Sequence, residues 1–261
     1  MSSIHPTAIM DPGAQLGQDV EVGPYSVIGP NVKVGDGARI HPHVVLDGWT
    51  TIGAKCEIFS FACIGTQSQD LKFKGARTFV EIGDGTTLRE YVTVNSGTTE
   101  GEVTRVGSGC HILACAHIAH GCVLGNGVIM VNGSLLAGEV IIEDQATVGA
   151  LTGIHQFVRI GRMCFVGGMS RITQDCPPFM IVVGIPPEVP GINSVGLTRK
   201  GVSPESQARL KDAHRLLEVG RRALEKRKPI LAWKVGNTEE GRKAAVSHTA
   251  NLGGAMALYQ A

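Results

Sequence analysis

A large aliphatic residue recurs at every sixth position along most of this chain, and this period constrains the fold more than any other feature. Stepping by six from Ile4 to Ile172 passes through 29 positions, and only Asp70, Ala76 and Glu100 interrupt the series. Six residues match neither the α-helical period nor the strand period, so the period belongs to a larger repeating unit. We interpret the unit as a short strand followed by a turn. Three units close a triangular coil of 18 residues, which predicts a parallel β-helix built from hexapeptide repeats.

The composition agrees with a narrow, regular coil. Glycine supplies 35 of the 261 residues, whereas aromatic residues make up only 5%. Small residues suit the thin interior of such a coil, and large rings do not. Adjacent coils are expected to pair as parallel strands roughly 4.8 Å apart. A residue therefore stacks on the residue one full coil further along the chain.

The period fails twice inside the coil, at residues 66–79 and 96–103, where the sequence becomes polar. We expect these two segments to leave the coil as loops, and loops on a rigid scaffold commonly carry function. The period ends after Ile172, and the prolines between residues 177 and 190 indicate an irregular connector.

A helical pattern replaces the six-residue period from Ser203 onward. Ser203 is suited to cap a helix, Pro204 suits its first position, and apolar residues follow at helical spacing. We therefore predict a β-helix catalytic domain over residues 1–190 and a C-terminal α-helical domain over residues 191–261.

Charge and cysteine content exclude several classes of protein. The net charge of +1 argues against a nucleic-acid-binding protein that neutralises many phosphates. The seven cysteines are irregularly spaced, so they indicate small buried residues of a reduced protein rather than a disulfide framework. The N-terminus shows no signal-peptide pattern, and the chain has no run of 18 apolar residues. These features predict a cytoplasmic protein without an integral membrane segment.

Candidate catalytic residues lie in the segment CHILACAHIAHGCVLGN, residues 110–126. His117 and His120 fall outside the periodic aliphatic positions, so their side chains are expected to point outward, where a general base can meet a substrate. Gly138 follows His120 by one coil and is expected to stack on it. A glycine beside a base leaves its backbone N–H accessible to a developing oxyanion.

The same step of one coil extends the patch. Glu139 is expected to stack on Gly121, and Gln156 follows Gly138. The predicted outward-facing patch comprises His120, Gly138, Glu139, His155 and Gln156.

A zinc site is an alternative use of the histidines, with His111, His117 and His120 as ligands. His111 and His117 are one repeat apart and lie on different faces of the coil. Their convergence on one ion would need a neighbouring subunit, so we predict that no metal is used.

Six motifs accompany the repeat in chain order: QDLKFKG, AHIAHGC, LAGEV, IHQF, QDCPPF and NSVGLTRKG. Together with the repeat, over about residues 1–215, they resemble the bacterial UDP-N-acetylglucosamine acyltransferases. The resemblance implies a left-handed parallel β-helix with a C-terminal helical domain, and a homotrimer with active sites between subunits. It also implies the first reaction of lipid A synthesis, in which a 3-hydroxyacyl group passes from acyl carrier protein to the 3-OH of UDP-N-acetylglucosamine. No cofactor is implied.

Matched residue by residue, the resemblance assigns roles to the candidates. His120 matches the general base that takes the proton of the sugar hydroxyl, and Gly138 matches the glycine of the oxyanion hole. The residues implied to bind the sugar nucleotide are Asp70, Lys72, His117, His155, Gln156, Asn193 and Arg199. Of these, the first two hold the glucosamine and the last two meet the nucleotide and its phosphates.

Three departures from the family pattern stand out. The family usually has Asp after the catalytic histidine, where this chain has Gly121, and commonly has histidine after the LAG run, where this chain has Glu139. The C-terminal tail also lacks the family's Arg-Gly ending. Losing an orienting carboxylate weakens a histidine base. Our hypothesis is that Glu139 returns a carboxylate to His120 from the next coil, and the alternative is that Glu139 is a solvated surface acid.

Residues 203–243 hold eleven Lys or Arg against six acidic residues, a net charge of +5. Acyl carrier proteins are acidic, so a basic helical surface would favour their docking. The candidate docking residues are Arg209, Arg215, Arg221 and Arg222.

The sequence leaves the length of the acyl chain open. Gly168 and Met169 fall in the region that sets this length in the family. Two other functions remain as alternatives: a related transferase that uses another acyl donor or a 3-amino sugar nucleotide, and a diverged trimer that is non-catalytic or metal-dependent.

Overall fold

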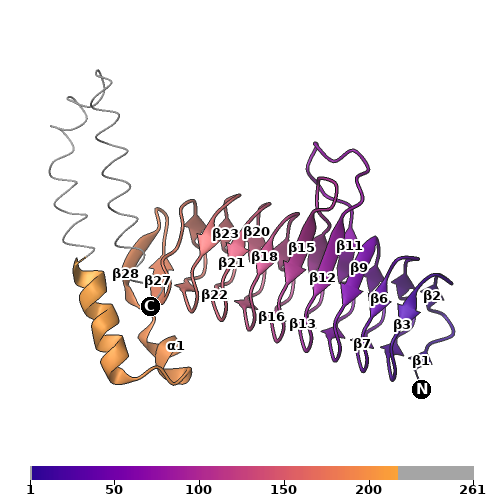
Figure 1. The fold of residues 1–261 in the computed structure, drawn as a ribbon, viewed down its shortest axis with the longest axis horizontal. Helices are drawn as coiled ribbons and strands as arrows, with labels where there is room; N and C mark the ends of the chain where they lie inside the picture. The colour runs from indigo at the N-terminus through magenta and orange to yellow at the C-terminus, as the bar shows by residue number, and fades with distance from the viewer. Residues whose placement is uncertain (1, 217–261) are drawn as a thin grey trace. The chain divides into compact units, whose positions relative to one another are not determined.

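The computed structural model describes residues 2–216, and most of this part is a coil of short strands (Figure 1). The chain divides into two compact units, Met1–Gln207 and Ala208–Ala261. The predicted domain boundary at residue 190 falls inside the last strand of the first unit. It stays a prediction, because most of the second unit lies outside the described residues.

The strands form three sheets, one on each face of the coil. The first sheet contains, in spatial order, β1 (Ser3–Ile4), β4 (Glu21–Val22), β7 (Arg39–Ile40), β10 (Glu57–Ile58), β13 (Thr87–Leu88), β16 (His111–Ile112), β19 (Ile129–Met130), β22 (Thr147–Val148), β25 (Phe165–Val166), β27 (Met180–Val183) and β28 (Glu188–Ile192). The second contains β2 (Ile9–Met10), β5 (Val27–Ile28), β8 (Val45–Leu46), β11 (Cys63–Thr66), β14 (Thr93–Asn95), β17 (His117–Ile118), β20 (Leu135–Leu136), β23 (Gly153–Ile154) and β26 (Arg171–Ile172). The third contains β3 (Gln15–Leu16), β6 (Lys33–Val34), β9 (Trp49–Ile52), β12 (Phe79–Ile82), β15 (Val103–Val106), β18 (Val123–Leu124), β21 (Ile141–Ile142) and β24 (Arg159–Ile160).

Parallel pairing joins each coil to the next with the predicted register. His117 of β17 pairs with Leu135 of β20, which is 18 residues further along. The number of residues between paired positions increases only where a loop intervenes, as between Cys63 of β11 and Thr93 of β14. The predicted three-faced parallel β-helix is therefore confirmed.

The core contains two stacks of side chains for every face of the coil. The second residue of most strands points inward, and Leu124 of β18 is 1% exposed. Two residues before each such position lies a second buried residue, usually small, such as Ala116 before Ile118. Four of the five buried cysteines occupy this second position, namely Cys56, Cys110, Cys122 and Cys164, whereas Cys176 lies in register with the inward residue Ile160. This explains why cysteine is frequent here without any disulfide, since all seven cysteines are free.

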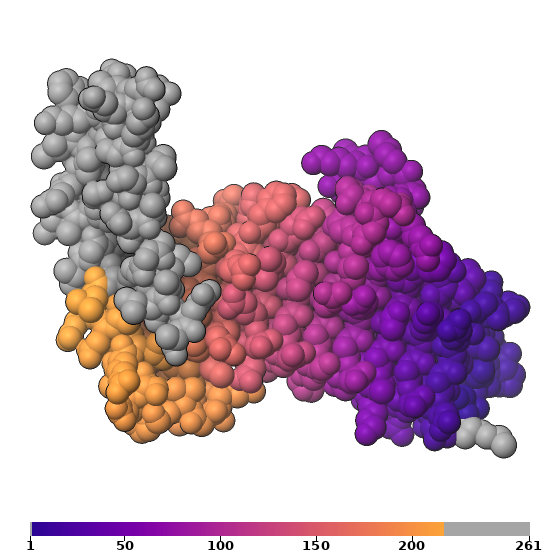
Figure 2. All heavy atoms as spheres, viewed as in Figure 1, coloured from indigo at the N-terminus to yellow at the C-terminus, as the bar shows by residue number. Residues whose placement is uncertain are grey.

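The two predicted loops leave the coil where the period fails. Residues 67–78 separate β11 from β12 and project from the coil, and residues 96–102 separate β14 from β15 (Figure 1 and Figure 2). Both loops return to the coil in register, because Glu81 of β12 pairs with Arg105 of β15. The scaffold therefore tolerates insertions without losing its parallel ladder.

The proline-rich connector is more regular than expected. Strand β27 pairs with β28 in an antiparallel hairpin that extends the first sheet. Pro186 and Pro187 lie in its turn, and Pro190 lies within β28. Proline is tolerated there because β28 is an edge strand, which leaves one side without ladder bonds.

Two helical segments follow the hairpin. Helix α1 (Ser194–Arg199) is followed by a helix that begins at residue 204 and continues to residue 216, the last described position. The Ser203 hydroxyl accepts a hydrogen bond from the Ser206 N–H at 3.2 Å, which confirms the predicted cap. Within residues 2–216, every helix falls short of the length and hydropathy that a membrane span requires.

The stability of the coil is expected to depend on its inward aliphatic stack. Leu124→Ala removes a fully buried side chain and should lower the free energy of unfolding by about 2–5 kcal/mol. Val123→Ala, on the outward face of the same strand, should cost less than about 1 kcal/mol. Denaturant titration of both variants measures the difference, and equal losses would contradict the inward stack as the main source of stability.

Candidate active site

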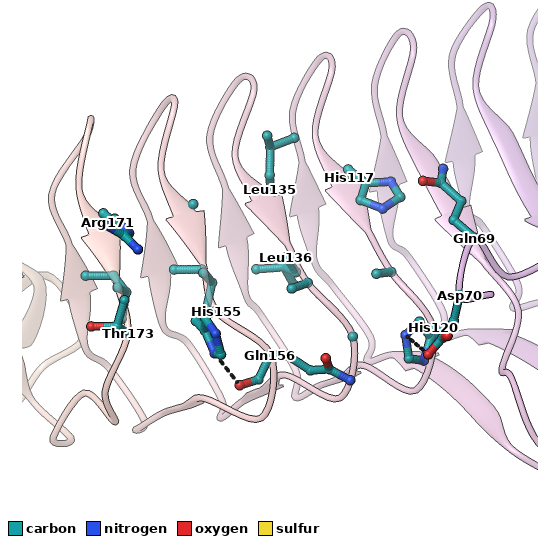
Figure 3. A pocket seen from close by; sticks show the side chains of 16 residues that line it. Gln69, Asp70, His117, His120, Leu135, Leu136, His155, Gln156, Arg171 and Thr173 are labelled. Carbon is teal, nitrogen blue, oxygen red and sulfur yellow. Dashed lines mark hydrogen bonds and ion pairs between the residues drawn. The ribbon is translucent and has the colours of Figure 1, made fainter. Parts of the chain in front are cut away.

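An open groove of about 660 Å³ runs across the turns that follow strands β17, β20, β23 and β26, beside the loop of residues 67–78 (Figure 3). Its lining brings together six of the predicted site residues: Asp70, His117, His120, Gly138, His155 and Gln156. Four successive coils and one loop therefore line a single surface, and the predicted residues come from three of these coils and the loop.

His120 lies in the turn after β17 and is only 9% exposed. It points outward, as predicted, but two loops cover it. Its Nε2 atom lies 3.6 Å from Oδ2 of Asp70, and its Nδ1 atom lies 3.7 Å from Oε1 of Glu102. Figure 3 shows the Asp70 side chain meeting the ring from the groove side. The imidazole is thus held between two carboxylates that come from separate loops.

Gly138 lies against the face of the histidine, as the step of one coil predicts. A Cβ atom at this position would collide with Nε2 and Cε1 of His120, so only glycine leaves the ring where it is. The Gly138 N–H donates to no other group in the described chain, and Gly138 lines the groove. A free N–H beside a candidate base is the geometry that an oxyanion hole needs.

Gly121 adopts a left-handed backbone conformation with φ of 65°. A Cβ atom here would fall against Oε1 of Glu102 and lie 2.7 Å from Oε1 of Glu139. The stacking of Glu139 on Gly121 is as predicted, and the Glu139 N–H donates to the His120 carbonyl at 2.9 Å. Two glutamate side chains therefore occupy the space that a side chain at position 121 would need.

Glu102 is a site residue that no pattern in the sequence predicts. Its Oε2 atom accepts hydrogen bonds from the N–H groups of Thr98 and Thr99 at 2.7 and 2.8 Å, and from the Thr99 hydroxyl at 3.1 Å. Burial alone would raise the pKa of Glu102, but these hydrogen bonds outweigh burial and lower its pKa. The only signal in the sequence was its place at the end of a polar loop, which does not reveal what the loop approaches.

The pKa of Glu139 shifts in the opposite direction from that of Glu102. Burial raises its pKa, and so does the negative charge of Glu102 next to it. Glu139 is not a lining residue of the groove. Its carboxyl group lies instead beside Gly121, the residue that follows His120.

Two further histidines line the groove as predicted. The His117 Nδ1 atom and the Thr93 hydroxyl share a hydrogen bond of 2.7 Å, and burial lowers the pKa of His117. His117 is therefore a neutral ring at physiological pH. The His155 Nδ1 atom lies 3.0 Å from the carbonyl of Gln156 (Figure 3), which makes Nδ1 the donor and fixes the tautomer.

Three predicted binding residues do not line this groove. Lys72 is exposed on its loop, and Arg199 is exposed in the last turn of α1. The Asn193 side chain caps α1 by accepting from the Gly196 N–H at 3.1 Å and donating to the Met163 carbonyl at 3.0 Å. Asn193 thus has a structural role in this chain, and contacts of all three residues with a nucleotide stay predictions.

The residues that could hold a metal differ from the predicted alternative of His111, His117 and His120. Among the described residues, the one group with suitable ligand atoms within 4.8 Å of one another is Glu102, His120 and Glu139. His111 and His117 are not part of it. A metal at this group would occupy the nitrogen side of the ring that faces Glu102.

Comparison with known proteins identifies the family. Residues 13–48 match the family described as bacterial transferase hexapeptide (six repeats), and residues 175–251 match UDP-N-acetylglucosamine O-acyltransferase, domain 2. The chain is 47% identical, over 83% of both chains, to the acyl-[acyl-carrier-protein]–UDP-N-acetylglucosamine O-acyltransferase of Verminephrobacter eiseniae. It is also 47% identical, over 88% of both chains, to the enzyme of the same name from Herminiimonas arsenicoxydans.

This chain belongs to the UDP-N-acetylglucosamine O-acyltransferase family. Its structure superimposes on LpxA from Acinetobacter baumannii with a TM-score of 0.80 at 42% identity, covering 82% of this chain and 83% of the other. The acyltransferase from Campylobacter jejuni gives 0.77 at 38% identity, covering 81% and 83%. The predicted fold class, a left-handed parallel β-helix with a helical C-terminal part, is thereby confirmed.

Gly138→Ala tests the contact between two coils at the centre of the site. The new methyl group must displace the His120 ring, and a misplacement of about 1 Å costs roughly 10²-fold in rate. We expect kcat of the acyltransferase to fall at least that far with the melting temperature little changed. Unchanged kcat would show that the ring position does not matter for turnover.

Glu139→Gln tests the raised pKa of Glu139 through stability. The folded chain keeps a proton on Glu139 that the unfolded chain releases near its ordinary pKa of 4.5, so folding of the wild type weakens as the pH rises from there through the raised pKa. Glutamine does not titrate, so the variant should gain stability relative to the wild type across this window. Urea titrations from about pH 4.5 to neutral pH measure the gain.

Glu81→Gln is the matched control for that experiment, because Glu81 lies in an exposed ion pair with Arg105. A difference between Glu139→Gln and wild type that stays constant with pH would contradict the raised pKa.

Proposed function

We propose that this chain transfers a 3-hydroxyacyl group from acyl carrier protein to the 3-OH of UDP-N-acetylglucosamine, the first step of lipid A synthesis, with His120 as the general base. The observation that carries the proposal is the position of His120 Nε2 in the groove, next to the free N–H of Gly138. A base and an oxyanion donor side by side are what acyl transfer to a hydroxyl requires.

The reaction follows from these two groups. Nε2 of His120 takes the proton of the sugar hydroxyl while the oxygen attacks the thioester carbonyl carbon. The negative charge that develops on the carbonyl oxygen is stabilised by the Gly138 N–H. The intermediate collapses by breaking the carbon–sulfur bond, and the thiol of the carrier protein leaves with the proton that His120 had taken. No residue changes its oxidation state, and no metal is needed.

Asp70 is proposed to hold the acceptor sugar. Its carboxylate lies 3.6 Å from Nε2, so a sugar hydroxyl that reaches the base also comes within hydrogen-bonding distance of Asp70. His117, His155 and Gln156 line the groove beyond it and are proposed to contact the rest of the sugar nucleotide. Lys72, Asn193 and Arg199 are proposed as further binding residues on the strength of the family motif.

The same proposal includes the binding partners of this chain and its cellular compartment. A homotrimer would bring a second copy to the open side of the groove, and such a wall is what an open groove of this kind needs to enclose a substrate. Acyl carrier protein is proposed to dock on the basic helical segment, of which Arg209 and Arg215 are described and Arg221 and Arg222 lie outside the described residues. The cytoplasm is the proposed compartment, because all seven cysteines are free thiols.

A 3-amino sugar nucleotide is the second candidate acceptor. An amine and a hydroxyl occupy the same place beside Nε2, and the Asp70 carboxylate there can accept a hydrogen bond from either group. The transfer assay therefore includes both acceptors.

Transfer is measured by mass spectrometry, with 3-hydroxyacyl carrier proteins of several chain lengths and UDP-N-acetylglucosamine. The wild type should add the mass of one hydroxyacyl group, and one chain length should be preferred. His120→Ala should lose the reaction by roughly 10²–10⁴-fold, the usual contribution of a general base.

Glu21→Gln serves as the control, because Glu21 lies in an exposed ion pair at the other end of the coil. A wild type that modifies only the amino sugar would replace the acceptor in the proposal. A His120→Ala variant as active as Glu21→Gln would exclude His120 as the base.

A further inference from the structure

Two carboxyl groups fill the space beside Gly121, and one of them, that of Glu102, faces Nδ1 of His120. Glu102 reaches this space from the loop before β15, and Glu139 reaches it from the next coil. One ligand atom from each of Glu102, His120 and Glu139 lies within 4.8 Å of the other two. The absence of a side chain at Gly121 makes room for both glutamates.

Glu102 is aimed at the ring by its own hydrogen bonds. Three donors from Thr98 and Thr99 fix its Oε2 atom, which turns Oε1 toward Nδ1 at 3.7 Å. Oε1 and Nδ1 are both buried, and within the described chain neither has a hydrogen-bond partner. Buried polar atoms normally have a partner. A movement of about 0.5 Å would make each the partner of the other.

We propose that Glu102 is the positioning residue for His120 and that Glu139 shares one proton with Glu102. Glu102 accepts the Nδ1–H of His120, which leaves the lone pair of Nε2 directed into the groove. This inference rests on the proposed function, in which Nε2 takes the proton of the acceptor hydroxyl. It also changes the hypothesis drawn from the sequence, because His120 pairs with Asp70 and Glu102 but not with Glu139 among the ion pairs of the described residues.

The charges around the His120 ring indicate that Glu102 and Glu139 hold one proton between them rather than none. Two adjacent carboxylates repel each other when both are ionised. The N–H groups of Thr98 and Thr99 stabilise the charge of Glu102, whereas Glu139 has no comparable donors within the described chain. The proton therefore resides on Glu139, in agreement with the opposite shifts of the two pKa values. Asp70 is the third acid at the ring, and it faces Nε2 from the opposite side.

Glu102→Gln is the decisive variant. Its amide oxygen keeps the bonds from Thr98 and Thr99, while its amide NH₂ faces Nδ1 and favours the tautomer that carries the proton on Nε2. That tautomer has no lone pair to accept the substrate proton. We expect kcat to fall by roughly 10²–10⁴-fold with KM for UDP-N-acetylglucosamine little changed, and Glu102→Asp to restore part of the loss.

Glu139→Gln should behave differently, because glutamine imitates a protonated glutamate and donates to Glu102 in the same way. Its kcat at neutral pH should fall far less than that of Glu102→Gln, with Glu81→Gln as the surface control. Its activity should also persist to higher pH than that of the wild type, where Glu139 loses its proton and the pair carries two charges. Equal losses in Glu102→Gln and Glu139→Gln, or no loss in Glu102→Gln, would overturn the assignment.

Imidazole ¹⁵N spectra give a second reading that does not depend on turnover. The His120 signal, assigned by its disappearance in His120→Ala, should show the proton on Nδ1 in the wild type and in Glu139→Gln, and on Nε2 in Glu102→Gln. If the wild type lacked transferase activity but still showed this pattern, the proposed function would be contradicted. The assignment of Glu102 as the positioning residue for His120 would stand. Stoichiometric zinc in the purified wild type, absent from Glu139→Gln, would overturn the shared proton in favour of a metal site.

Discussion

The parallel backbone ladder between coils is the interaction on which the rest of this structure depends. Each coil donates its N–H groups to carbonyls of the next coil, so residues one coil apart are held in direct contact, as His117 and Leu135 are. The active site uses this spacing without any special device. Gly138 touches His120 because the ladder places it there, and the same ladder brings Glu139 to Gly121. A rigid ladder fixes these contacts at small entropic cost during catalysis.

The two insertions supply side chains that the regular ladder cannot place over His120. A regular coil presents side chains only along its own faces, so it offers nothing that reaches back over a residue such as His120. The loop of residues 67–78 supplies Asp70 on one side of the ring, and the loop of residues 96–102 supplies Glu102 on the other. Both loops interrupt the hexapeptide period, yet both return in register. The site therefore depends on the places where the repeat is broken as well as on the regular ladder.

Two glycines show how a missing side chain can be a chemical feature. At position 138, in the lining of the groove, glycine admits the imidazole, and its N–H has no acceptor within the described chain. At position 121 it admits two carboxyl groups from neighbouring segments. Because position 121 is glycine, the acid that orients His120 is Glu102 and not the residue after the histidine. Glu102 is in turn coupled to a second titratable group, Glu139. This coupling makes the protonation of Glu139 part of the electrostatics around His120.

The order of residues alone predicts the β-helix, its three faces, both insertions and the stacking of Gly138 on His120 and of Glu139 on Gly121. All of these follow from one period, because a fixed repeat converts positions in the chain into positions in space. The sequence did not determine the contact between Glu102 and His120, the capping role of Asn193 or the hairpin of β27 and β28. These depend on how irregular segments fold back on the coil, and no period describes that. Only the tertiary structure could decide which of two glutamates meets the histidine, since that choice depends on hydrogen bonds from Thr98 and Thr99 within a loop.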